Sequence, residues 1–250
     1  LSAFADGQAE PSVSDKSFFA NGTPITITED VPSGAAQSTI SGTNNIAGTS
    51  AYVSWEYEGA TYYLGVSKDA TVYGGGDGSA SKVVVPNTSI VMTGGRIWNL
   101  FGGNLGKKSK VADECSEVTG DVSIKVSGKD SYVSNLFHGG GAFNSCVKGT
   151  VAMEFDGVDF CDDSDPAALS PYVNGGVYGN GSEGSRDIDN GTMQTYAVAN
   201  NVEIAAKGSE FYLLGAGGSG STKVVSGSVK LDDCKDDSLY FGGINDNVCQ

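Results

Sequence analysis

The fold is decided by residues 89–95, SIVMTGG, which are followed closely by residues 98–103, WNLFGG. The same order of residue types returns in residues 123–128, SIKVSG, and residues 134–140, SNLFHGG. Each copy has a strand of alternating apolar and polar residues, a turn, a short apolar strand and a glycine corner. The match indicates an internal repeat, and weaker copies begin near residues 150, 201 and 228.

Stacked copies of this kind bury their apolar residues only against one another, so they build one continuous core. The glycines fit corners where φ is positive or where stacked backbones approach closely. We therefore expect an all-β chain that forms a right-handed parallel β-helix, a solenoid with loops inserted at its corners. The alternative is a β-sandwich of short antiparallel strands.

The chain divides into three parts on this interpretation. Residues 1–20 are a flexible polar leader, residues 21–80 form an N-terminal β cap with a first coil, and residues 81–250 hold the repeats. Within the cap, residues 52–57 and 61–66 flank Glu58-Gly59-Ala60 and predict a hairpin or two successive strands.

Composition narrows the class of partner. The chain has 15 Lys and Arg against 30 Asp and Glu, a net charge of −15, which argues against nucleic acid as a partner. It has no apolar run long enough to insert into a membrane. A chain of 250 residues is also long enough to form a stable monomer, which is the expected oligomeric state. Ala3-Phe4-Ala5 is typical of the end of a signal peptide and predicts a secreted or cell-surface protein.

Five cysteines lack the paired spacing of a zinc site. In an exported chain the repeat alignment favours one disulfide between Cys115 and Cys146 and a second between Cys234 and Cys249, which leaves Cys161 free. The alternative is that all five are buried thiols of a reduced chain.

From Thr71 to Gly243 the repeats resemble right-handed β-helix surface proteins of Gram-positive gut and oral bacteria, which share the pectate-lyase-like fold. The resemblance lies in the alternating strand, the Leu-Phe pair and the run of glycines. It implies an adhesin-like bacterial protein that is secreted or attached to the cell wall.

Enzymes with this fold act on acidic sugars, so a polysaccharide lyase or hydrolase is an alternative function. The motif order of polygalacturonases is absent, since Asp162-Asp163 follows Phe137-His138-Gly139 instead of preceding it. If the chain is an enzyme, the catalytic candidates are Arg186, Asp187 and Asp189, although aspartates in such loops more often cap turns. Whether the chain is an enzyme stays open, and the residues favour a non-enzymatic module.

Two further groups of residues are candidate sites. No cofactor is required, but calcium is a candidate ligand of the acidic loop that holds Asp159, Asp162, Asp163 and Asp165, for which a solvated loop is the alternative. His138 is expected to make one backbone hydrogen bond at a glycine corner and not to act in catalysis. Ligand-binding aromatic residues are predicted at Trp55, Tyr57, Tyr62 and Trp98.

The function predicted from these observations is surface display or adhesion. A rigid lateral face and variable corner loops would bind a host or environmental glycan or an extracellular matrix protein. The alternatives are the lyase or hydrolase and a passive surface stalk.

Overall fold

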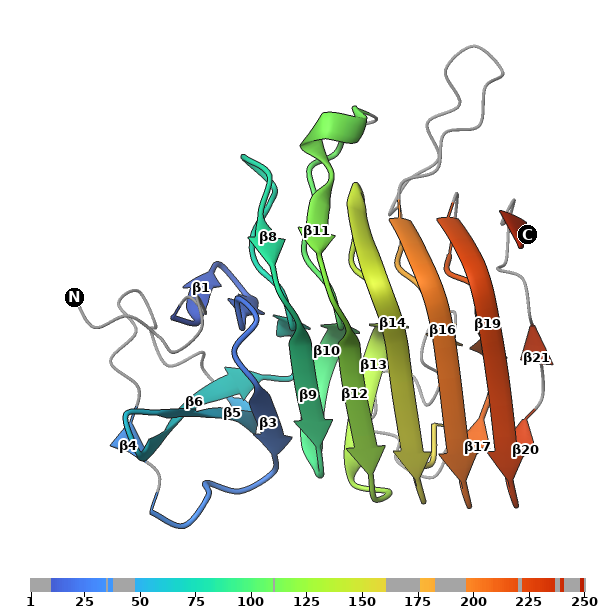
Figure 1. Ribbon diagram of the computed structural model, residues 1–250. Coiled ribbons are helices and arrows are strands. Elements are labelled where there is room, and N and C mark those ends of the chain that lie inside the picture. Colours follow the sequence, from blue (N-terminus) through green and yellow to red (C-terminus); the bar gives the residue numbers. More distant parts are fainter. Residues whose placement is uncertain are drawn as a thin grey trace.

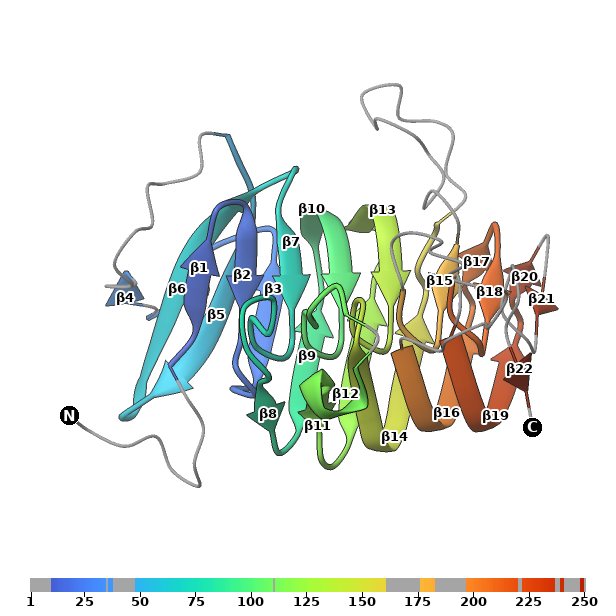
Figure 2. The same cartoon turned by 90° about the horizontal axis from the view of Figure 1, so that it is seen from above.

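The computed structural model of the protein describes residues 10–34, 36–37, 48–109, 111–160, 176–182, 197–219, 222–236, 239–240 and 248–249. Within these ranges the regular secondary structure is all strand, apart from one turn of 3₁₀ helix at Ala112–Glu114. Two large sheets lie face to face, with the first strands of the chain at one end and the last at the other (Figure 1 and Figure 2).

The eight-stranded sheet contains, in spatial order, β1 (Ser12–Ser14), β2 (Ser17–Phe19), β7 (Thr71–Tyr73), β10 (Gly95–Phe101), β13 (Ser131–His138), β15 (Val177–Tyr178), β18 (Leu214–Gly215) and β21 (Leu239–Tyr240). The twelve-stranded sheet runs from β22 (Val248–Cys249) through β19 (Thr222–Asp232), β16 (Ala197–Lys207), β14 (Ser145–Asp156), β12 (Val122–Ser127), β9 (Thr88–Met92), β3 (Ile25–Thr28), β5 (Thr49–Tyr57) and β6 (Ala60–Ser67) to β4 (Ala36–Gln37). It also includes β8 (Val84–Val85) and β11 (Ser116–Val118), and a separate pair is formed by β17 (Glu210–Phe211) and β20 (Lys235–Asp236).

The expectation of a right-handed parallel β-helix is wrong. Both sheets are mixed, because β1 pairs antiparallel with β2, and β5 pairs antiparallel with β3 and β6. Neither sheet closes on itself, since the strand order of each runs between two ends. The alternative sandwich of antiparallel strands is also wrong, because most neighbouring strands, such as β12 and β14, are parallel. The structure is an open all-β arrangement of two mixed sheets.

Parallel pairing brings together the segments that the sequence analysis aligned. In the twelve-stranded sheet Ile90 lies opposite Ile124, Ile124 opposite Met153, Met153 opposite Ile204, and Ile204 opposite Val229. Each strand alternates buried and exposed residues, so a shift by one residue would turn this apolar row toward solvent. The apolar pattern therefore fixes the register between strands.

The core lies between the two sheets. One cluster of buried residues joins Leu100 and Phe137 of the eight-stranded sheet to Ile124 and Met153 of the twelve-stranded sheet. Phe155, Phe160 and Phe211 add edge-to-face and tilted ring contacts near the end of β14. The sheets are held together by this apolar layer, because apolar burial is the largest favourable term in folding.

A second buried row consists of stacked rings along the eight-stranded sheet. Phe19, Tyr73, Phe101, His138 and Tyr178 follow one another with centroids 4.9–5.3 Å apart and planes within 6–11° of parallel. We call these five residues the ring stack. Its histidine donates a hydrogen bond from Nδ1 to the carbonyl oxygen of Asn180 at 3.0 Å, which confirms the expected backbone contact. The row exists because parallel strands in register place equivalent side chains directly above one another.

The N-terminal strands complete one end of the molecule. The residues around Glu58 and Gly59 form the hairpin between β5 and β6, with φ of 47° and 76° at the turn. Positive φ at both central residues is typical of a tight hairpin turn. Residues 12–19, which the sequence analysis placed in the leader, form β1 and β2, and Phe18 and Phe19 are buried.

Candidate functional site

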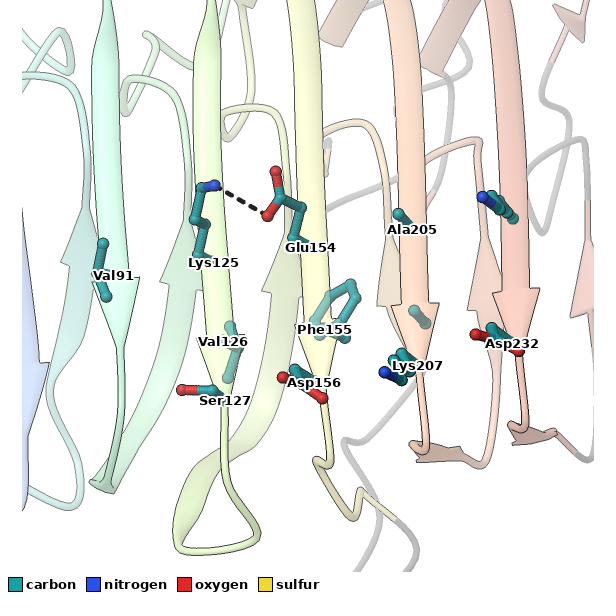
Figure 3. Close-up of a pocket in the computed structure, with 12 residues that line it drawn as sticks. Val91, Lys125, Val126, Ser127, Glu154, Phe155, Asp156, Ala205, Lys207 and Asp232 are labelled. Carbon is teal, nitrogen blue, oxygen red and sulfur yellow. Dashed lines mark hydrogen bonds and ion pairs between the residues drawn. The ribbon is translucent and has the colours of Figure 1, made fainter.

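A shallow hollow of about 520 Å³ lies on the outer face of the twelve-stranded sheet, near the carboxyl ends of its central strands. We call it the sheet-face hollow. Side chains from five parallel strands, β9, β12, β14, β16 and β19, surround it (Figure 3). The residues that line it are Val91, Lys125, Val126, Ser127, Glu154, Phe155, Asp156, Ala205, Ala206, Lys207, Lys230 and Asp232.

Strand register explains why the hollow forms at this place. Val91, Lys125, Glu154, Ala205 and Lys230 occupy equivalent positions of adjacent strands and make one outward row across the sheet. The row has long side chains on β12, β14 and β19 but only a methyl group at Ala205 on β16. The short side chain between Glu154 and Lys230 leaves the floor of the hollow open.

A second outward row lies two residues further along the strands. Ser127, Asp156, Lys207 and Asp232 are paired in register across β12, β14, β16 and β19. Lysine on β16 therefore has a carboxylate on each neighbouring strand. Opposite charges at directly paired positions attract one another, so the negative, positive and negative side chains of Asp156, Lys207 and Asp232 stabilise one another.

The hollow differs electrostatically from the rest of the chain. Its three lysines balance its three carboxylates, whereas the whole protein carries a net charge of −15. Inside the hollow Lys125 and Glu154 form an ion pair at 2.9 Å (Figure 3). Within the described part of the chain neither Lys207 nor Lys230 forms an ion pair closer than 4.0 Å. The ammonium groups of these two exposed lysines are therefore available to bind an external anion.

The aromatic residues predicted as ligand contacts lie elsewhere. Trp55 is only 5% exposed and its ring contacts Phe18 in the core, so it offers no surface to a ligand. Tyr57 and Tyr62 are half-buried and pack against the same core at the hairpin. Trp98 is half-buried on β10, in the other sheet. These four aromatic residues do not form one face.

The catalytic and metal candidates are mostly beyond what the structure describes. Arg186, Asp187 and Asp189 lie outside the described residues, as do Asp162, Asp163 and Asp165. Asp159 is described and lies in a single parallel bridge to Glu210. Within the described ranges no three His, Cys, Asp or Glu side chains gather as metal ligands do. The calcium site and the catalytic set remain predictions from sequence.

The cysteines show one close pair. The sulfur atoms of Cys115 and Cys146 lie 2.7 Å apart, which exceeds the roughly 2.05 Å of a disulfide bond, so the predicted disulfide is not formed and both are free thiols in this structure. Cys234 is also a free thiol. The predicted disulfide between Cys234 and Cys249 is therefore not formed in this structure, and Cys161 lies outside the described residues.

No protein family, curated protein or solved structure matches the chain. The resemblance to bacterial surface proteins therefore stays a prediction. No helix in the described ranges has the length and apolar character needed to cross a membrane.

Sequence reasoning did not single out the sheet-face hollow. Its lysines and carboxylates are ordinary polar residues of alternating strands, and charged residues at such positions are usually only solvated. A signal was nevertheless present, because the aligned copies place Lys125, Glu154 and Lys230 at one position and the small Ala205 between them. Aligning the copies residue by residue would have revealed the outward row.

Proposed function

We propose that the protein is an extracellular binding module that holds an extended, acidic glycan across the sheet-face hollow. The proposal is supported chiefly by the two outward rows, which place lysines beside carboxylates over an open floor. Ammonium groups of Lys207 and Lys230 would bind carboxylate or sulfate groups of the glycan. Glu154, Asp156 and Asp232 would accept hydrogen bonds from sugar hydroxyl groups.

The shape of the site favours a polymer over a small ligand. The hollow is open, and its two outward rows cross five and four strands that are spaced roughly 4.8 Å apart. Sugar rings of an extended glycan recur at a similar interval, so successive rings would meet equivalent positions on successive strands. The local balance of charge also makes the hollow less repulsive to an acidic chain than the rest of a protein with a net charge of −15.

Removing Lys207 and Lys230, which form no ion pair with the described residues, is expected to weaken glycan binding at least about tenfold, because the glycan loses one charge-assisted hydrogen bond with each lysine. The protein with Lys207→Ala and Lys230→Ala would be compared with the wild type by affinity electrophoresis through gels that contain uronic-acid, sulfated or neutral polysaccharides. Retardation of the wild type in an acidic gel only, with loss of retardation in the variant, is the expected result.

The matched control carries Lys16→Ala and Lys68→Ala, two exposed lysines at the other end of the molecule, and changes the net charge equally. Ala205→Tyr is a second variant, which fills the floor without changing charge and should also abolish retardation. Equal losses in the lysine variant and its control would mean nonspecific attraction. Unchanged migration of the wild type in every gel would contradict the proposed function.

A further inference from the structure

We propose that Cys115 and Cys146 are a redox site, which low-molecular-weight disulfides oxidise to a disulfide bond between neighbouring strands and which thiols reduce again. The inference does not depend on glycan binding. The repeat alignment already suggested this pairing, and the structure supplies two grounds: the position of the two sulfurs on paired strands and the charges around them.

The first ground is position. Cys115 immediately precedes β11, and Cys146 lies in β14 next to Ser145, which pairs in register with Ser116. Their sulfurs are 2.7 Å apart without any bond between them. Parallel neighbours held by this ladder keep both sulfurs in place, so bond formation requires only a small approach of the side chains.

The second ground is the charged surroundings. Glu117 follows Cys115 by two residues and pairs in register with Cys146. Its carboxylate binds Lys82 at 3.0 Å and lies 3.9 Å from Lys148. These two lysines therefore sit beside the cysteine pair, where positive charge favours a thiolate over a thiol.

The pKa values of the two thiols are also shifted in opposite directions. The hydrogen bond donated by the Cys115 thiol lowers the pKa of Cys146, and Lys148 and Lys82 act in the same direction, while burial and the carboxylate of Glu117 oppose the shift. The same hydrogen bond, together with burial, raises the pKa of Cys115. The pair thus holds one proton more tightly than the other, which is the usual arrangement of a reactive dithiol.

The exchange can be written in two steps. The Cys146 thiolate, which the hydrogen bond from Cys115 favours, attacks one sulfur of the external disulfide and releases one external thiolate. Cys115 then loses its proton and attacks the Cys146 sulfur of the mixed disulfide, which displaces the second external thiolate. The protein loses two protons and two electrons, and the external disulfide becomes two thiols.

The test is peptide mapping of the full-length protein after treatment with oxidised glutathione or with dithiothreitol. Alkylation without reduction, followed by mass spectrometry, should find the peptides of Cys115 and Cys146 joined after oxidation and separately alkylated after reduction. The oxidised protein should also unfold about 5–10 °C higher, because the bond closes the loop from residue 115 to residue 146 in the unfolded chain.

Variants separate this pair from the other thiols. Cys146→Ser and Cys115→Ser should each abolish the dependence of the melting temperature on oxidant, whereas Cys234→Ser should retain it. If the single variants do not fold, mapping of the wild type still decides. The proposal is overturned if oxidised glutathione leaves Cys115 and Cys146 separately alkylated, or joins either of them to a different cysteine.

Discussion

Replacing Gly102 with alanine should lower the free energy of unfolding by about 3 kcal/mol, the largest loss that we expect from adding a single methyl group. A Cβ atom at this position would lie 2.1 Å from the carbonyl oxygen of Gly139 and 2.5 Å from a methyl group of Val122. The first neighbour is backbone and cannot rotate away. Relief would therefore require the two chain segments to separate, which would break the 2.9 Å hydrogen bond from the Gly102 amide to the carbonyl oxygen of His138.

The matched control is Gly128→Ala in the turn between β12 and β13. Gly128 has a φ of +79° and nothing within 4 Å of its virtual Cβ, so alanine there should cost only about 1 kcal/mol of backbone strain. Urea unfolding followed by far-ultraviolet circular dichroism measures both losses. A loss at residue 102 no larger than that at residue 128 would show that the two chain segments accommodate the methyl group and that close approach of the backbones does not require glycine there.

Acidification is expected to remove about 3 kcal/mol of stability through His138 alone. Burial within the ring stack lowers the pKa of this histidine to about 4, against 6.5 in the unfolded chain. The unfolded state therefore takes up a proton at a higher pH than the folded state does. The stabilisation is complete above pH 6.5, falls as the pH drops from 6.5 to 4, and is absent below that window.

His138→Phe isolates this contribution from that of the carboxylates. A phenyl ring can occupy the place between Phe101 and Tyr178, but the variant loses the hydrogen bond to Asn180, so it should be about 1 kcal/mol less stable at pH 7.5. Its stability should then decline less than that of the wild type between pH 6.5 and 4. Because the chain has one histidine, its C2 proton also gives a single NMR titration, and a midpoint near pH 6.5 would refute the lowered pKa.

The sequence predicted the strands and their neighbours better than the arrangement as a whole. Residues 89–92 and 123–127 alternate clearly, and they pair in register as the alignment implied. Alternation reports which side chains face a core, but it does not report whether the sheet around that core closes. The antiparallel contacts of residues 49–67 were also ambiguous, because Glu58-Gly59-Ala60 fits either a hairpin or two successive strands.

The site was harder to predict for a related physical reason. Trp55 alternates with polar neighbours like an exposed residue, yet its face of the strand turns toward Phe18 and the core. The sheet-face hollow arises from a small residue, Ala205, among long ones on adjacent strands, which is a property of strand pairing and not of any one segment. A site formed by side chains of adjacent strands can be predicted only after the register between those strands is known.

The end-to-end order of the strands determines how the molecule would respond to tension. The first strands lie at one end of both sheets and the last at the other, so a pull between the chain ends loads the hydrogen bonds of one strand pair at a time (Figure 1). Such loading unzips strands in succession and requires less force than shearing them together. A disulfide bond between Cys115 and Cys146 would prevent the segment between them from extending. The strands β12 and β13 would then not lengthen the pulled chain when the other strands separate.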